Sequence, residues 1–210
     1  MDLMKEIKET LTDYPTLIFS KKKWRIEGEF EIKNEETNVV LESYTIEILI
    51  PKQFLKVRLP MVTEVSHKIP RHPDRHVYKD GLFCLGTALS EYLICREGIT
   101  FRKFLEEILK PFLATQLAIS VGWLKSFPQG EYEHGAVGVF QAYCEFFKIN
   151  NIDEIITAIK IGLKKNQRNT LCYCSSGKKI KSCHLDNYKI IRNFNKKQLQ
   201  EDLKIIECLP

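Results

Sequence analysis

Two stretches of the sequence combine residues that can do chemistry. The first, "RHPDRHVYKDGLFCLG" (residues 71–86), places Cys84 three residues after an Asp-Gly turn and near two histidines. A thiol in such a loop is a candidate nucleophile when its neighbours favour the thiolate, and otherwise a small buried side chain. The second, "CYCSSGKKIKSCH" (residues 172–184), has the pattern C-x-C-x8-C-H, which is typical of a metal site.

The second stretch offers a complete set of metal ligands. Thiolate and imidazole groups suit zinc, which prefers tetrahedral sites, and Ser175-Ser176-Gly177 provides a turn between the ligand pairs. Because the protein fills every position, we expect structural rather than catalytic Zn²⁺. So short a segment builds little core, so metal binding is expected to supply its folding free energy, on the order of 10 kcal/mol. The predicted ligands are Cys172, Cys174, Cys183 and His184.

Composition limits where the protein acts. Charged residues make up 28% of the 210 residues, and no run of eighteen uncharged apolar residues occurs, so no membrane span is expected. The longest candidate, "PFLATQLAISVGWL", is predicted to form a buried helix. The N-terminus lacks the basic and apolar regions of a secretion signal. We therefore predict a cytoplasmic protein whose seven cysteines are mostly reduced.

The positive charge lies at the C-terminal end. Residues 160–210 carry 12 Lys and Arg against 4 Asp and Glu, whereas the whole chain has a net charge of +5. Such a tail can contact nucleic acid or an acidic protein surface. A solvated small domain with many lysines explains the same composition, and the sequence alone favours it, so nucleic acid is not expected as a partner.

Hydrophobic spacing predicts strands in the first half of the chain. After a helix through Met4, Ile7 and Leu11, the stretch "WRIEGEFEI" alternates, with Trp24 expected on the buried face together with Ile26, Phe30 and Ile32. The runs "VVLESYTIEILIP" and "QFLKVRLPMVTEV" are also typical of strands. Short polar links between them predict an antiparallel meander.

From Gly98 onwards the spacing becomes helical. Thr100 is expected to cap a helix that Pro111 kinks or restarts, and "YEHGAVGVFQAYCEFF" is compatible with another helix. Asn151 and Glu154 form a capping box for a third. Strands followed by helices indicate an α+β fold.

Both stretches resemble known families. Residues 172–184, including Ser-Gly-Lys-Lys, resemble the SEC-C motif, a small zinc-binding module found in bacterial proteins that include the protein-translocation ATPase. The meander, "HPDRHVYKDGLFCLG" and "GITFRKFLEEIL" together resemble the ubiquitin-conjugating enzymes. The resemblance implies the domains 1–148 (ubiquitin-conjugating-like), 149–168 (connecting helix) and 169–210 (zinc-binding tail).

The second resemblance implies site residues and an activity. Cys84 would carry the C-terminus of a modifier-like protein as a thioester and transfer it to an amine. Asp74 stands where the family has an asparagine, and an ionised carboxylate repels an oxyanion. His76 is therefore the candidate oxyanion donor, while Asp74 would orient His76 or accept a proton. The alternative is that His76 and Asp74 only shape the loop. His72 is likewise either a catalytic or a structural residue.

The departures from the family pattern resemble the conjugating component of CBASS antiphage operons. That resemblance implies that the acyl donor is the C-terminus of a nucleotide cyclase. The sequence has no glycine-rich nucleotide loop, so either a separate activating enzyme supplies the donor or the reaction starts from some other activated form. Two rivals remain: a catalytically inactive ubiquitin-conjugating-like module that binds partners, and a basic nucleic-acid-binding zinc protein.

Overall fold

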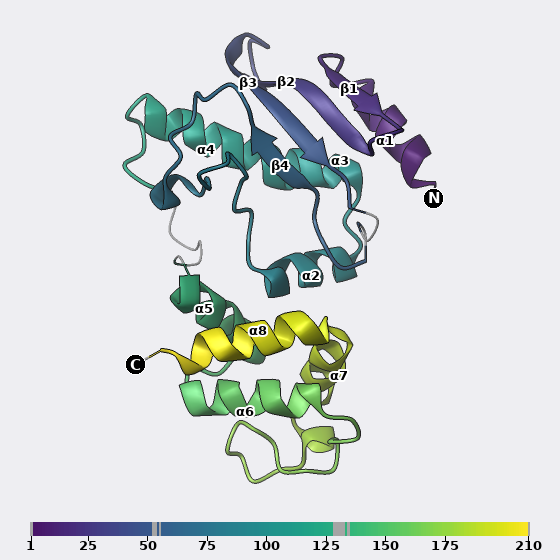
Figure 1. Ribbon diagram of the computed structural model, residues 1–210, viewed down its shortest axis with the longest axis vertical. Coiled ribbons are helices and arrows are strands. Elements are labelled where there is room, and N and C mark those ends of the chain that lie inside the picture. The colour runs from purple at the N-terminus through teal and green to yellow at the C-terminus, as the bar shows by residue number, and fades with distance from the viewer. Residues whose placement is uncertain (1, 52–53, 55, 128–132, 134, 210) are drawn as a thin grey trace. The chain divides into compact units, whose positions relative to one another are not determined.

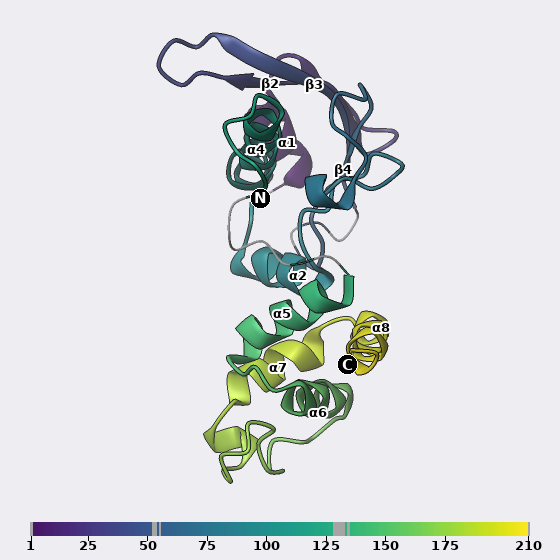
Figure 2. The same ribbon diagram turned by 90° about the vertical axis from the view of Figure 1, so that its left-hand side faces the viewer.

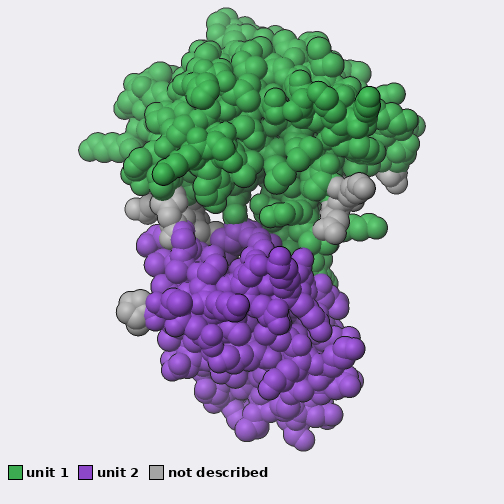
Figure 3. Space-filling model, in the orientation of Figure 1, with its two compact units in different colours: residues 1–86, 91–131 green, residues 87–90, 132–210 purple. Residues whose placement is uncertain are grey.

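The chain forms two compact units in the computed structural model, which describes residues 2–51, 54, 56–127, 133 and 135–209. Unit 1 comprises residues 1–86 and 91–131, and unit 2 comprises residues 87–90 and 132–210 (Figure 3). The division at residue 131 places the helix that follows it in unit 2. The domain limits at residues 148 and 168 rest on motifs rather than on contacts, and they stay a prediction.

Unit 1 begins with a helix and a four-stranded sheet. Helix α1 (Leu3–Leu11) precedes strands β1 (Leu17–Ser20), β2 (Arg25–Lys33), β3 (Val40–Leu49) and β4 (Met61–Glu64). The strands pair in chain order and all pairs are antiparallel, which confirms the predicted meander and the α+β class (Figure 1). The meander has one strand more than expected, because β1 was not predicted.

One face of the sheet forms the core of unit 1. Alternate residues of β2 and β3 are buried, among them Ile26, Phe30, Ile46 and Ile48. Helices α1 and α4 (Lys110–Ser120) lie on that side of the sheet (Figures 1 and 2). The opposite face carries charged side chains such as Glu27 and Glu47, so alternation places one set of residues inside and the other in solvent.

Two strand predictions need correction. Trp24 was expected on the buried face, but it precedes β2, adopts φ 49° and is exposed, because the chain turns there after β1. The third predicted run, "QFLKVRLPMVTEV", is a strand only over β4. Its residues 56–60 lie in turn or irregular backbone, where Pro60 lacks a hydrogen to donate, and residues 53 and 55 lie outside the described residues.

The helical hydrogen bonding of unit 1 changes just before Pro111. After α2 (Ala88–Glu97), Thr100 caps α3 (Phe101–Lys103) through the Lys103 amide, as predicted. The chain then widens into a π-helical turn, η2 (Phe104–Leu109), before α4. Pro111 cannot donate a hydrogen bond, so the wider turn accommodates the interruption that the sequence predicted.

The predicted apolar helix ends earlier than expected. Helix α4 stops at Ser120, and Trp123 is 75% exposed, so the end of "PFLATQLAISVGWL" does not belong to a buried helix. Gly122, at φ 81°, lies in the turn that ends the helix. Within the described residues, no helix is both long and apolar enough to cross a membrane.

Unit 2 is a helical body with an irregular loop. Its elements are α5 (Gly135–Phe147), α6 (Ile152–Leu163), η3 (Ile180–Ser182), α7 (Leu185–Asn193) and α8 (Lys196–Glu207). Asn151 caps α6 through the Glu154 amide, which confirms that part of the predicted capping box. Buried Tyr143 donates to Asp202 at 2.8 Å and thereby joins α5 to α8.

Candidate thiol site and candidate metal centre

Cys84 lies on a small hairpin that follows β4. The Cys84 amide donates to the His76 carbonyl at 2.8 Å, the Tyr78 amide donates to the Leu82 carbonyl at 2.9 Å, and Val77 bridges Phe83 between them. Antiparallel pairing places directly opposed residues on the same side. His76 and Cys84 therefore share one face of the hairpin.

The two faces of the hairpin differ in burial. Val77 and Phe83 point into the core of unit 1 and are 2% and 5% exposed. By the strand period of two, His76, Tyr78 and Cys84 lie on the other face, where each is exposed or partly exposed. The alternation therefore leaves the thiol at the surface while its neighbours anchor the backbone.

The hairpin extends the end of β4. The Phe83 amide donates to the Val62 carbonyl at 2.8 Å, and the Glu64 amide donates to the Gly81 carbonyl at 3.0 Å. Gly81 adopts φ 89°, and a Cβ atom there would lie 2.6 Å from the Glu64 carbonyl oxygen. Glycine is thus required at the turn, both for its backbone angle and for this close approach.

Arg75 ties the segment before the hairpin to α4. Its Nε donates to Gln116 Oε1 at 2.8 Å, and Gln116 Nε2 donates back to the Arg75 carbonyl at 2.6 Å. Gln116 is fully buried, and Phe127, beyond α4, packs its ring 4.7 Å from that of His76. The Arg75 side chain therefore joins the segment before the hairpin to α4.

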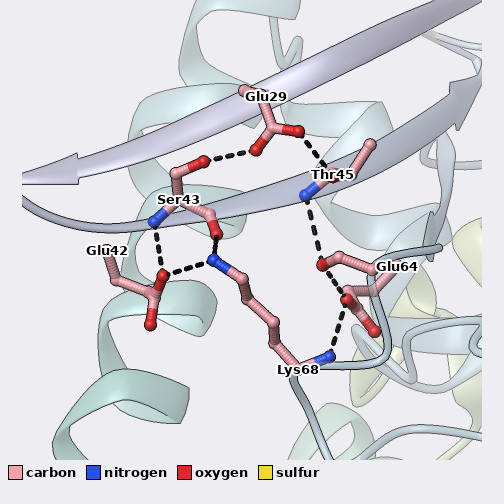
Figure 4. Close-up of polar contacts among 7 residues, drawn as sticks. Glu29, Glu42, Ser43, Thr45, Glu64 and Lys68 are labelled. Atoms are coloured by element: carbon pink, nitrogen blue, oxygen red, sulfur yellow. Dashed lines mark hydrogen bonds and ion pairs between the residues drawn. The ribbon is translucent and has the colours of Figure 1, made fainter.

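Polar contacts fix the chain between β4 and the hairpin. Lys68 Nζ lies 2.7 Å from both Glu42 Oε1 and the Ser43 carbonyl, and Glu64 accepts from the Lys68 amide (Figure 4). The Glu64 side chain is 0% exposed and pairs with Arg71 Nη1 at 2.9 Å. The exposed Lys68 pair contributes little to stability, whereas the buried carboxylate depends on its cation.

The thiol site favours the thiolate of Cys84. A hydrogen bond from His76 is the largest cause that lowers the pKa of the Cys84 thiol, the Tyr78 hydroxyl adds a second, and burial opposes both. The same contact raises the pKa of Tyr78 to about 12, because the phenol loses its proton less readily beside a thiolate. Polar neighbours thus outweigh the cost of partial burial.

His72 and Asp74 lie on η1 (Pro73–Arg75), directly before His76. The His72 ring accepts from the Asp74 amide at 3.3 Å, so His72 caps this short helix. Its Nδ1 also lies 3.4 Å from Asp74 Oδ2, and both side chains are mostly exposed. The catalytic roles predicted for His72 and Asp74 stay predictions.

Tyr78 was not among the predicted site residues. The sequence nevertheless contains a hairpin pattern that would have pointed to it, since Tyr78 and Leu82 flank a three-residue turn that ends in Asp80-Gly81. A hairpin closing at that turn brings Tyr78 onto the same face as Cys84. Gln116 gives no such signal, because its partner Arg75 is 41 residues away.

The four predicted metal ligands meet at one point in unit 2. Their ligand atoms all lie within 4.8 Å of one another. Cys172 Sγ and Cys183 Sγ are each 3.2 Å from His184 Nδ1, and Cys174 Sγ is 3.5 Å from both other sulfurs. Tetrahedral ligands at metal distances of about 2.0–2.3 Å are separated by roughly 3.3–3.8 Å. The cluster could therefore hold one metal ion.

A short ribbon places the ligands. The Cys172 amide donates to the Lys178 carbonyl at 2.7 Å, and Leu171 bridges Lys179. Between these strands the backbone turns back through Ser175 and Gly177, both at positive φ. The turn predicted from Ser-Ser-Gly thus brings the first ligand pair toward the second, which lies between η3 and α7.

The cluster is attached to the helical core. Tyr173 is buried between Phe147 and His184, with ring centroids 5.0 and 5.1 Å away, and Ile180 is fully buried. The segment therefore packs on the helices of unit 2, and the expectation that metal binding supplies its folding free energy stays a prediction. The helices α7 and α8, which the sequence did not predict, extend the body on which the ribbon packs.

We expect His76 to control the reactivity of Cys84. His76→Ala removes the hydrogen bond that lowers the pKa of the Cys84 thiol most, while the burial that raises this pKa remains. The pH at which the alkylation rate reaches half its maximum should therefore increase. A hydrogen bond to a charged group contributes about 1.5–3 kcal/mol, so alkylation near neutral pH should slow by about tenfold or more. Iodoacetamide labelling followed by peptide mass spectrometry measures the rate at Cys84.

His67→Ala is the matched control. His67 is an exposed histidine of unit 1 that also adopts a left-handed backbone, at φ 57° against 49° for His76. Both replacements therefore carry the same backbone cost, and only one removes the contact with Cys84. Equal labelling profiles for the two variants would contradict the role of His76.

Comparison with protein family models, with curated proteins and with solved structures gives no match to this chain.

Proposed function

We propose that unit 1 is a ubiquitin-conjugating-like acyl carrier whose nucleophile is Cys84. The observation that carries this proposal is the thiol site: a partly exposed cysteine, anchored by a buried hairpin face, with His76 and Tyr78 favouring its thiolate. A buried filler cysteine would need neither polar neighbour.

The order of elements supports the proposal. An N-terminal helix, an antiparallel meander, a cysteine loop after the last strand and a helix capped by Thr100 follow one another as the resemblance to ubiquitin-conjugating enzymes implies. The hairpin also gives a reason for the Gly81-x-x-Cys84 spacing, because Gly81 makes the turn and Cys84 lies opposite His76.

The proposed chemistry is a thioester exchange followed by aminolysis. The Cys84 thiolate attacks the carbonyl carbon of a donor thioester, a new carbon–sulfur bond forms, and the donor thiol leaves with its electron pair and takes up a proton. An acceptor amine then attacks the same carbon, an amide forms, and Cys84 departs as the thiolate while a base takes the amine proton. His76 and Tyr78, which hydrogen-bond the thiolate, stabilise it as both nucleophile and leaving group.

We propose Zn²⁺ as the ion of the unit 2 cluster. Three thiolates and one imidazole form a donor set that zinc prefers, and four protein ligands leave no position for a substrate or a reactive water. The bound ion would close the ribbon and fix it to the helices. Zinc would then have a structural role, separate from the thiol site.

The donor follows from the resemblance to CBASS conjugating components. The first donor to test is the C-terminal tail of a nucleotide cyclase, charged by a separate activating enzyme. A cytoplasmic protein is proposed because the thiols of Cys84 and of the cluster must stay reduced for either role. This donor also fixes the biological setting of the proposal, which is antiphage defence.

The test is a covalent adduct at Cys84. The chain is incubated with an activating enzyme, ATP and a candidate tail, and the products are separated without reducing agent. The wild-type adduct should disappear with thiol, whereas Cys84→Ser should give an ester that resists thiol and is cleaved by base. Cys208→Ser, an exposed cysteine outside both sites, is the control and should behave like wild type.

One outcome contradicts the proposal. If Cys84→Ala retains the adduct, or supports antiphage protection as well as wild type does, the thiol is dispensable. Unit 1 would then be a partner-binding module without acyl transfer.

A further inference from the structure

The loop between α6 and α7 carries positive charge without any acidic residue. Residues 164–184 include six Lys and Arg and no Asp or Glu. All six are exposed. We call them the basic loop, and its members are Lys164, Lys165, Arg168, Lys178, Lys179 and Lys181.

The charges of the basic loop are not neutralised within unit 2. Elsewhere in the unit, Lys160 pairs with Glu207 at 2.8 Å and Lys189 pairs with Asp186 at 3.2 Å. None of the six cations has an ion-pair partner in the described part of the chain. Zn²⁺ bound by three thiolates and one neutral imidazole would have a net charge of −1. Together with the six cations, the loop would then carry a net charge of about +5. Repulsion among them favours an anionic partner.

The ribbon holds several of these cations close together. The Lys181 amide donates to the Arg168 carbonyl at 2.9 Å, and the Lys178 carbonyl accepts from Cys172 at 2.7 Å. In Figures 1 and 2 this segment forms the irregular loop that connects α6 with α7. Because the metal ligands lie within the same loop, the cations belong to an ordered surface rather than to a loose tail.

The neighbouring residues fit phosphate better than a protein partner. Protein interfaces are rich in aromatic residues and poor in lysine at their centre, and the only aromatic residues of the loop are Tyr173, which is buried, and His184, which lies in the cluster. The exposed residues between the cations are mostly amides and hydroxyls, which donate to phosphate oxygens. They are Asn166, Asn169, Thr170, Ser175, Ser176 and Ser182.

We propose that the basic loop binds the phosphate backbone of nucleic acid. Because its exposed residues offer no aromatic ring to stack on bases, recognition should be independent of sequence. This inference goes beyond the proposed acyl transfer and does not depend on it. A conjugating unit linked to such a loop would act where nucleic acid is present.

The test measures binding of the full chain, loaded with Zn²⁺, to a labelled duplex of about 20 base pairs by fluorescence anisotropy. If all six cations contact phosphates, the logarithm of the association constant should fall with the logarithm of salt concentration with a slope of about −5. The triple variant Lys178→Gln, Lys179→Gln, Lys181→Gln should reduce the size of that slope by about 3 and weaken binding roughly 100-fold at about 0.1 M KCl.

A second triple variant is the control. Lys189→Gln, Lys196→Gln and Lys197→Gln remove the same charge from exposed positions of unit 2 outside the loop, and binding should change by only a few-fold. Zinc content and circular dichroism must match wild type in both. Equal losses in the two variants would overturn the proposal. So would tighter binding to polyglutamate than to the duplex, which would indicate an acidic protein as the partner.

Discussion

Cys172→Ser is expected to abolish stoichiometric metal binding and to loosen the ribbon while leaving the helices of unit 2 in place. A serine hydroxyl is a poor replacement for a thiolate, and loss of even an outer partner of a metal ligand costs about 10–100-fold in affinity, so loss of a ligand should cost more. The helices should persist because their contacts, such as Tyr143 with Asp202, do not involve the ion.

Native mass spectrometry measures the metal, and trypsin measures the ribbon. The basic loop contains six trypsin sites, which the metal-loaded protein should protect and the variant should expose. Cys208→Ser is again the matched control, since Cys208 is exposed and lies outside the cluster. A loss of helical circular dichroism together with the metal would contradict the expectation and show that the helices require the ion to fold.

Local patterns in the sequence predicted most elements of unit 1. The spacing of Met4, Ile7 and Leu11 and the cap at Thr100 are properties of a few neighbouring residues, and the structure confirms both. Strand β1 escaped because four residues after Pro15 are too short a pattern to recognise. Its existence depends on pairing with β2, which is tertiary information.

The candidate sites also differ in whether their contacts join residues that are close or distant in the sequence. The metal ligands lie within thirteen residues, so spacing alone was enough to bring them together. The thiol site needs a hairpin, a buried face and a tie from Arg75 to Gln116, and only the last of these spans distant parts of the sequence. For that reason the sequence gives no signal for Gln116, whereas the hairpin that brings Tyr78 to the face of Cys84 is local and could have been predicted.

The strongest single tie beneath the thiol site is expected to be the buried pair of Glu64 and Arg71. Removing Arg71 as Arg71→Met leaves a fully buried carboxylate without its cation, which typically costs about 3–5 kcal/mol. The Ser66 hydroxyl and the Lys68 amide still donate to Glu64, but neither supplies a charge. Adding Glu64→Gln removes the stranded charge, so the double variant should be more stable than Arg71→Met alone.

Tryptophan fluorescence isolates the response of unit 1, because Trp24 and Trp123, the two tryptophans of the chain, both lie in it. Urea unfolding followed by this signal should place Arg71→Met well below wild type. Arg102→Met is the matched control: this exposed arginine pairs with Asp13 at 2.8 Å, and its loss should cost less than about 1 kcal/mol. The Arg71 guanidinium lies against Gly81 at the hairpin turn, since a Cβ atom there would be only 2.7 Å away from it. Arg71→Met should therefore also loosen the Cys84 hairpin and change the alkylation rate of Cys84. Equal stability of the two arginine variants would mean that the buried pair does not hold the site.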